Sequence, residues 1–185
     1  ITFGYKKLGH VLHPGCEYAG KIYCEEIGFI PEAIKEVAPT TFSYDKMDIT
    51  LVPVRKARSN KGSYGKVLVI AGAPNMSGAC YLSAKAAYRA GAGLVKILTA
   101  KENREILQTS LPEAILATYE KATKDGEILD ELDWATVIVF GPGLGDSPVV
   151  EHLLELVLEH AKVPVVLDAD GLNLLAKRMD KKEIF

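Results

Sequence analysis

KVLVIAGAPNMSGACYLSAKAAYRAGAGLVKILT, residues 66–99, decides the fold of this 185-residue chain. It opens with an apolar run at 67–71 and continues through a turn of small residues at 72–78. An alanine-rich stretch at 79–90 follows, and a second apolar run begins at Leu94. A strand, a glycine turn, a helix and another strand in this order are typical of one βαβ unit.

Small residues set the ends of the helix expected at 79–90. Ser77 is placed to cap its N-terminus, and Gly91 is placed to end it in a left-handed conformation. One nearly smooth face of the helix is expected to lie close against the sheet. That face carries Ala79, Ala86, Ala87 and Ala90.

The same order of elements recurs downstream. The apolar residues 137–140 are typical of a buried parallel strand and lead into the loop GPGLG at 141–145. A helix follows, with Asp146 or Ser147 at its N-cap and Pro148 in its first turn. The next strand, at 164–167, leads into Asp168-Ala169-Asp170-Gly171 and a short helix through Leu175.

Between these units, residues 114–119 are expected to form a partly polar strand near an edge of the sheet. Asp125-Gly126 is expected to mark a turn. Strands that alternate with helices predict an α/β fold, with a mostly parallel sheet and helices on both of its faces.

Parallel topology brings the loops after the carboxyl ends of the strands to one edge of the sheet. Open α/β sheets bind their ligands at that edge. The loops at 72–78, 141–145 and 168–171 are therefore expected to converge. Two of them lead into helix N-termini, where free backbone N–H groups favour an anion, and their glycines let a phosphate approach the backbone.

Two acidic residues, Asp168 and Asp170, belong to this edge. If the strand continued through them, their side chains would point to opposite sides and would not pair as acid and base. Two interpretations of Asp168 stay open. Its carboxylate either accepts hydrogen bonds from nearby backbone N–H groups or contacts substrate or water.

Residues 1–44 differ in character from the rest. They predict a strand at the start, a loop, a short strand and a helical turn from Pro31. His10 and His13 complete no recognised set of zinc ligands, so no metal site is expected. Further on, the basic run at 55–63 favours a solvated linker, and the alternative is a phosphate-contacting loop with Lys61 closest.

Composition limits the functional classes. A formal net charge of −2 gives no electrostatic attraction to nucleic acid or to an anionic membrane. No apolar run is long enough to span a bilayer, and no signal-peptide pattern opens the chain. Three cysteines without close pair spacing favour reduced thiols in a cytoplasmic protein. Because the chain starts without methionine and turns apolar again at 182–185, we expect a fragment.

Five motifs occur together and in order, and jointly they resemble the ADP/ATP-dependent NAD(P)H-hydrate dehydratase family, which has a ribokinase-like fold. They are NKGSYG at 60–65, GAPNMSGA at 72–79, RAGAG at 89–93, GPGLG at 141–145 and DAD at 168–170.

The start of the chain carries a second resemblance. Thr2-Phe3-Gly4 and LHPGCEYAG at 12–20 look like the last part of an NAD(P)H-hydrate epimerase domain, which is Rossmann-like. Together, the two resemblances divide the chain into residues 1–44, the end of an epimerase domain, and 45–185, the first part of a dehydratase domain. The whole looks like the middle of a bifunctional nicotinamide-nucleotide repair enzyme.

The resemblance implies a two-part chemistry. The epimerase, which uses K⁺, interconverts the R and S forms of hydrated NADH or NADPH. The dehydratase uses ADP or ATP, with Mg²⁺ expected, to phosphorylate the hydroxyl of the S-hydrate, and phosphate then leaves to restore the nicotinamide ring. Positioning the phosphoryl group and neutralising its charge would lower the barrier. A homo-oligomer is also expected.

The resemblance also assigns candidate site residues. The hydrate site is expected to be lined by the glycine loop, the preceding turn and the acidic corner: Gly141, Gly143, Gly145, Ala79, Asp168 and Asp170. Lys61 and Asn75 are weaker candidates for contact with the nucleotide cofactor.

Some features of the family are missing from residues 1–185. The Gly-x-Gly-Asp segment with the family's proton-abstracting aspartate does not occur, and a Pro-His-x-x-Glu segment is expected just after Phe185. The potassium-binding and catalytic residues of the epimerase would precede Ile1. We therefore expect no catalytic residue within this chain, and no activity of the 185-residue chain by itself in either reaction.

Two other functions remain open from the sequence. One is a ribokinase-like kinase of a small alcohol such as a thiamin precursor, which would share the sheet and the anion-binding loop. The other is a non-catalytic nucleotide-binding or oligomer-forming scaffold that retains the loops.

Overall fold

In the computed structural model, which describes residues 1–37, 40–52 and 54–179, the apolar runs form one parallel sheet. Its strand order is β5-β4-β3-β6-β7, and each neighbouring pair is parallel. The strands are β3 (Lys66–Ile70), β4 (Leu94–Ala100), β5 (Ile115–Tyr119), β6 (Val137–Phe140) and β7 (Val165–Leu167). The predicted parallel sheet is confirmed, and so is the position of the 114–119 strand at an edge.

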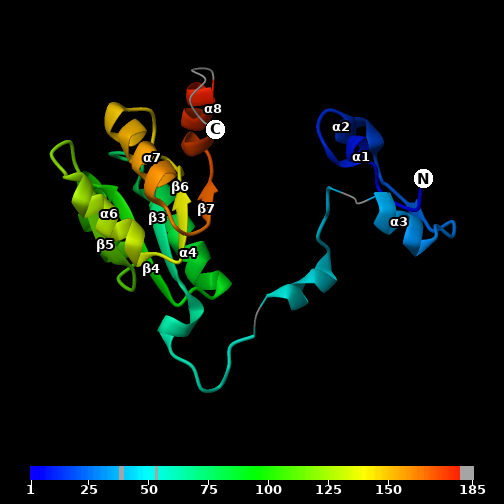
Figure 1. Ribbon diagram of the computed structural model, residues 1–185, viewed down its shortest axis with the longest axis horizontal. Helices are drawn as coiled ribbons and strands as arrows, with labels where there is room; N and C mark the ends of the chain where they lie inside the picture. Colours follow the sequence, from blue (N-terminus) through cyan, green and yellow to red (C-terminus); the bar gives the residue numbers. More distant parts are fainter. Residues whose placement is uncertain (38–39, 53, 180–185) are drawn as a thin grey trace. The chain divides into compact units, whose positions relative to one another are not determined.

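Helices cover both faces of this sheet (Figure 1). The helices are α4 (Ser77–Ala90), α5 (Arg104–Ser110), α6 (Asp125–Trp134), α7 (Pro148–His160) and α8 (Asp170–Met179), with short 3-10 helices η2 (Lys61–Tyr64) and η3 (Lys101–Asn103). The first two pack on one face, and α6, α7 and α8 pack on the other.

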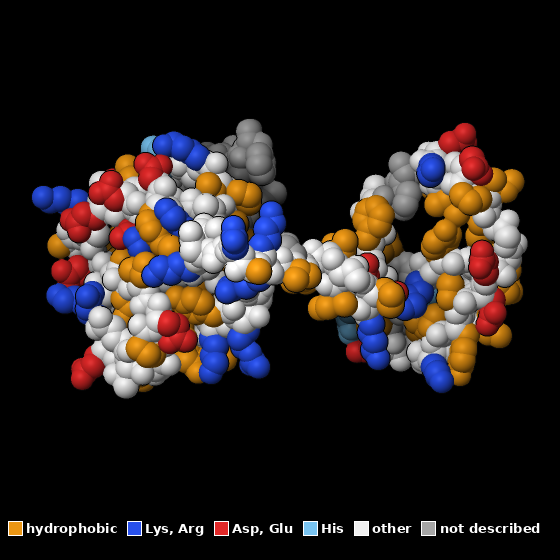
Figure 2. All heavy atoms as spheres, turned by 90° about the horizontal axis from the view of Figure 1, so that it is seen from below, with side chains coloured by type: hydrophobic (Ala, Val, Ile, Leu, Met, Phe, Trp, Pro, Cys, Tyr) orange, Lys and Arg blue, Asp and Glu red, His pale blue; other side chains and the backbone are white. Residues whose placement is uncertain are grey.

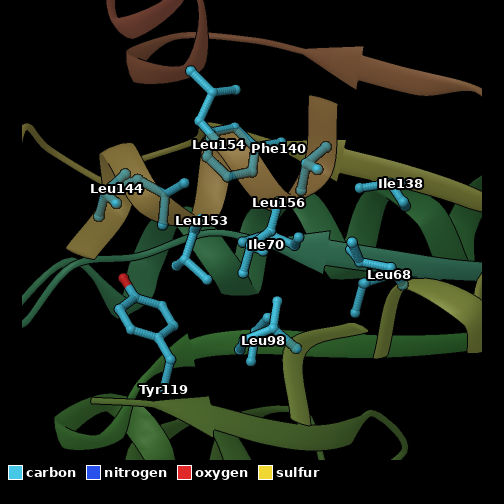
Figure 3. Packing of buried hydrophobic residues seen from close by; sticks show 14 of the residues in the cluster. Leu68, Ile70, Leu98, Tyr119, Ile138, Phe140, Leu144, Leu153, Leu154 and Leu156 are labelled. Atoms are coloured by element: carbon cyan, nitrogen blue, oxygen red, sulfur yellow. The ribbon is translucent and has the colours of Figure 1, made fainter. Parts of the chain in front are cut away.

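Alternation along each strand divides the core between the two faces. In β3, Leu68 and Ile70 face α6 and α7, whereas Val69 faces α4, and all three are fully buried. Figure 3 shows the larger cluster, in which leucines of α7 pack on Ile70 and on Phe140 of β6. Burial of this apolar surface stabilises the sheet and fixes its register.

The helix after β3 differs in two details from the prediction. Ser77 is the first residue of α4 and Met76 precedes it as the N-cap, without a capping side chain, so the predicted Ser77 cap is wrong. The sheet-facing positions are Cys80, Ala84 and Ala87, because alanine occurs on every side of this helix and does not mark a face. Gly91 ends the helix in the left-handed conformation (φ +106°), as predicted.

Two other helix starts also bear on the predictions. Asp125-Gly126 begins α6 rather than forming a turn, because an acidic residue in the first turn complements the helix dipole. Ser147 caps α7 as predicted, its Oγ accepting from the Val150 N–H, and Pro148 follows at the first helical position. The strand start expected at 182–185 lies outside the described residues.

The chain divides into two units, Ile1–Val54 and Arg55–Phe185. The first contains β1 (Thr2–Phe3), α1 (Leu8–Val11), α2 (Gly15–Ala19), β2 (Cys24–Glu25), α3 (Pro31–Val37) and the 3-10 helix η1 (Lys46–Leu51). The two units meet after Val54, which is later than the boundary expected at 44–45, because η1 belongs to the first unit.

The first unit buries little of its apolar surface. Among its described residues, Thr2 is the only one classed as buried. Large hydrophobic side chains cover its surface (Figure 2), including Tyr18, Phe42 and Tyr44. A segment that leaves this much apolar surface in water lacks a core of its own.

No helix in the described part of the chain is long and apolar enough to cross a membrane. Cys16 and Cys24 are exposed free thiols, and Cys80 is a buried one.

His152 of α7 connects two helices of the larger face. Its Nε2 lies 2.8 Å from Asp125 Oδ1 at the start of α6, and its Nδ1 lies 3.4 Å from Glu155. Hydrogen bonds to Asp125 and then to Glu155 raise the pKa of His152 above its ordinary value. The protonated ring therefore stabilises the folded state below the ordinary pKa, and this contribution is lost as the pH rises through the raised pKa.

We predict that His152→Gln lowers the free energy of unfolding at about pH 6 by less than about 1 kcal/mol, the usual range for an exposed pair, and changes it little at about pH 9. Urea unfolding at both pH values measures this. A double-mutant cycle with Asp125→Asn isolates the pair, and a coupling that is as large at the higher pH would contradict the prediction.

Candidate functional site

Three loops leave the carboxyl edge of the sheet around one switch point. β3 and β6 are neighbours, and from them the sheet extends through β4 and β5 on one side and β7 on the other. Ligands in open α/β sheets bind in the crevice at such a point. The loops after β3, β6 and β7 lead into α4, α7 and α8, so all three of these loops lead into helix N-termini rather than the two predicted.

Two backbone hydrogen bonds join the first two loops. The Gly72 N–H donates to the Pro142 carbonyl (N···O 2.9 Å), and the Ala73 N–H donates to the Gly143 carbonyl (2.6 Å). The loops therefore lie side by side. Their predicted convergence is confirmed.

Glycine is required where these loops approach their neighbours. A Cβ atom placed on Gly143 (φ +63°) would lie 2.7 Å from the Ala79 Cβ. One placed on Gly141 (φ +128°) would lie 1.8 Å from the Asp168 carbonyl oxygen. Gly145 also has a positive φ, of +69°. The backbone of the glycine loop thus lies close to both Ala79 and the third loop.

Asp170 ties the third loop to the second. Its Oδ2 accepts a hydrogen bond from the Gly145 N–H (2.8 Å), and the residue is half-buried. Because β7 ends at Leu167 and α8 begins at Asp170, the two acids do not alternate along a strand. The condition for the predicted opposite orientation, a strand that continues through both acids, is therefore not met. Asp168 is exposed, and within the described residues its carboxylate accepts no hydrogen bond, which leaves it free for a ligand or water.

Backbone strain gathers at the same edge. In the described parts of the chain, Asn75 (φ +68°) and Ala169 (φ +47°) are the residues other than glycine with positive φ. Asparagine tolerates this conformation, whereas it costs an alanine roughly 1–2 kcal/mol. Such strain clusters at ligand sites. Asn75 thus lies at the edge where the cofactor was expected.

Lys61 does not join the other candidate residues. It begins η2 just before β3, and a Cβ atom placed on Gly93, just before β4, would lie 1.6 Å from its carbonyl oxygen. Both positions precede strands, so Lys61 lies at the amino edge of the sheet, opposite the three loops. Residues 55–63 are exposed, as expected of the solvated linker. The contact of Lys61 with a phosphate at the loop edge is therefore not supported.

Three buried polar residues at the site were missed in the sequence. Thr99 and Asn103 bond to the 72–73 backbone, and the Tyr119 hydroxyl finds no hydrogen-bond partner in the described structure. Tyr119 lines a cavity of about 210 Å³ together with Pro74 and Leu144. The available signal was a polar residue at or just after the carboxyl end of a strand.

Burial raises the pKa of two groups near the site, the Tyr119 hydroxyl and the Cys80 thiol. It raises the pKa of Tyr119 to about 12, with smaller contributions from Cys80 and Glu102. It also raises the pKa of the Cys80 thiol, which donates to the Ala71 carbonyl (3.0 Å). Both groups stay neutral at physiological pH and neither serves as a base. Across the described ranges, no cluster of three His, Cys, Asp or Glu side chains is placed to hold a metal ion.

We predict that Gly141→Ala destabilises the chain by about 2–4 kcal/mol, because its Cβ would collide with backbone of the third loop at a strained φ. Gly126→Ala is the matched control. Nothing lies within 4 Å of a Cβ at Gly126 in helix α6, so this change should stabilise by up to about 1 kcal/mol. Urea unfolding of both variants measures the difference, and equal effects would refute the proposed close approach.

Comparison with known proteins gives a consistent result. The family model described as NAD(P)H-hydrate dehydratase matches residues 67–184. The bifunctional NAD(P)H-hydrate repair enzyme of Coxiella burnetii is 39% identical over 99% of this chain and 37% of its own length. The ADP-dependent (S)-NAD(P)H-hydrate dehydratase of Listeria monocytogenes is 37% identical over 68% of this chain and 45% of its own length.

Solved structures support the fold. A ribokinase-like superfamily protein of Enterococcus faecalis matches with a TM-score of 0.63 at 28% identity, over 69% of this chain and 45% of that one. An ADP/ATP-dependent NAD(P)H-hydrate dehydratase of Bacillus subtilis, co-crystallised with ATP/Mg²⁺, matches with a TM-score of 0.53 at 32% identity, over 65% and 42%. The predicted ribokinase-like α/β fold is confirmed.

The chain spans less than half the length of the relatives it matches. Within that span the family model covers most of the second unit, including all three loops of the site. This chain belongs to the NAD(P)H-hydrate dehydratase family.

Proposed function

We propose that the protein carrying this chain repairs hydrated NADH and NADPH by ADP- or ATP-dependent dehydration of the S-hydrate. The observation that carries the proposal is the joining of the 72–73 and 142–143 backbones at the switch point, next to Ala79. It gives a glycine-lined surface on which a dinucleotide can approach the backbone closely. The named activities of the relatives supply the chemistry.

In this proposal the loops orient the hydrate rather than react with it. Ala79 and Gly143 form the contact surface, and the Asp168 carboxylate is free to accept a hydrogen bond from a substrate hydroxyl. The N-termini of α4 and α7 add positive potential for phosphate oxygens. Holding the hydroxyl in line with the terminal phosphoryl group would account for much of the rate enhancement.

The nucleotide would bring its own metal ion. Mg²⁺ would be held mainly by the phosphates, and the exposed Asp168 carboxylate of these loops would be available to it. Bound Mg²⁺ would neutralise charge that develops on the transferred phosphoryl group.

Residues 1–44 are proposed to be the end of an epimerase domain. The bifunctional enzyme of Coxiella burnetii matches 99% of the chain, whereas the dehydratase of Listeria monocytogenes matches 68%. The exposed apolar side chains of the first unit fit a segment that packs within a larger domain. A cytoplasmic homo-oligomer is part of the same proposal, and the three free thiols fit a reducing compartment.

The test is turnover by the full-length protein that carries this chain. S-NADPH hydrate with ADP or ATP should be converted to NADPH, measured by the recovery of dihydronicotinamide absorbance and by phosphate release. Hydroxymethylpyrimidine, the substrate of the alternative kinase, should not be phosphorylated.

Gly143→Ala should raise the KM for the hydrate by about tenfold or more, because the new methyl group occupies the contact with Ala79. Gly126→Ala, which lies in α6 and outside the three loops, should leave the KM for the hydrate unchanged. Phosphorylation of the pyrimidine without clearance of the hydrate would overturn the proposed function in favour of the kinase.

A further inference from the structure

We propose that Thr99 and Asn103 are positioning residues that set the register of the two ligand-facing loops, a role that rests on the proposed function. Neither residue belongs to these loops. Thr99 lies near the carboxyl end of β4, and Asn103 lies in η3 just after it. Both are buried, at 0% and 2% exposure, so they act through other groups rather than by touching a ligand.

The Asn103 amide binds two successive carbonyls of the first loop. Its Nδ2 lies 3.1 Å from the Gly72 oxygen and 2.9 Å from the Ala73 oxygen, and it also lies 3.0 Å from Thr99 Oγ1. Thr99 Oγ1 donates to the Gly72 carbonyl at 3.0 Å. An amide that serves two adjacent peptide groups fixes the orientation of both.

Gly72 and Ala73, which these side chains bind, also hydrogen-bond to the second loop. The N–H groups of Gly72 and Ala73 donate to the carbonyls of Pro142 and Gly143. The peptide group between Gly72 and Ala73 is therefore held by β4–η3 side chains through its carbonyl, the Gly72 oxygen, and bound to the glycine loop through its N–H, that of Ala73. A change in Asn103 would rotate these peptides and shift Gly143 relative to Ala79.

The loop is closely surrounded at Gly72. A Cβ atom placed on Gly72 would lie 2.2 Å from Cys80 Sγ and 3.1 Å from Asn103 Nδ2. The loop thus passes between α4 and the Asn103 side chain, and Asn103 forms one wall of that passage. Buried polar networks of this kind specify one arrangement when every member is satisfied.

Thr136 gives a comparison within the same sheet. Its Oγ1 accepts from the Lys66 N–H (2.8 Å) and lies 3.1 Å from the Lys66 carbonyl oxygen, so it ties the amino ends of β3 and β6. This chemistry resembles that of Thr99, since a threonine hydroxyl bonds to the backbone of β3 or its extension. Thr136 reaches the edge opposite the loops.

The experiment compares four variants of the full-length protein by steady-state kinetics, each assayed well below its own unfolding temperature. Asn103→Asp replaces the donor with a carboxylate facing two carbonyls, and Thr99→Val removes only the hydroxyl. Both should raise the KM for S-NADPH hydrate by about tenfold or more, and raise it more than the KM for the nucleotide. Thr99→Ser, which keeps the hydroxyl, and Thr136→Val should stay within about twofold of the unchanged protein.

Amide hydrogen exchange supplies the readout that a stability effect alone would not move. In Asn103→Asp and Thr99→Val, exchange at Gly72 and Ala73 should accelerate relative to the amides of β3, whereas in Thr136→Val it should not. Unchanged exchange at these two amides, or an equal KM increase in Thr136→Val, would overturn the positioning role. If the unchanged protein does not clear the hydrate, the proposed function fails, and the exchange data alone then decide whether Asn103 and Thr99 hold the loops.

Discussion

The rest of the site depends on one pair of hydrogen bonds, from the N–H groups of Gly72 and Ala73 to the carbonyls of Pro142 and Gly143. The β3–β6 ladder ends at Ile70 and Phe140, so without this pair the two loops would be free to separate. The close approach leaves no room for a Cβ atom at Gly72, Gly141 or Gly143, which is why glycine occupies these three positions. The ligand-facing edge is thus a consequence of how two peptide backbones satisfy each other in a confined space.

Much of the framework followed from local patterns. The apolar runs gave the strands, and parallel pairing then required the loops to share an edge, because only one edge receives the carboxyl ends of parallel strands. Gly91 and Ser147 marked helix ends through chemistry confined to a few residues. The candidates Ala79, Gly141, Gly143, Gly145 and Asp170 do lie together, although their contacts with a ligand remain predictions.

The misses have physical reasons. Asp125-Gly126 has the composition of a turn, and the same acidic residue also suits the first turn of a helix, so composition alone did not distinguish the two. Thr99 and Asn103 bond to residues some thirty positions earlier, and no local pattern reports such a contact. Lys61 was a candidate by charge alone, and charge does not say at which edge of a sheet a residue lies. Exposed apolar residues before Val54 carry no periodicity from which a partner surface could be derived.

The most direct test of the account is a backbone amide NMR titration of the full-length protein with S-NADPH hydrate. The amides of 72–79 and 141–145 should shift together, with one common saturation curve, and those around Lys61 and Thr136 at the opposite edge should stay unchanged. Shifts confined to one of the two loops, or centred on the amino edge of the sheet, would contradict the claim that the joined loops form a single ligand-binding surface.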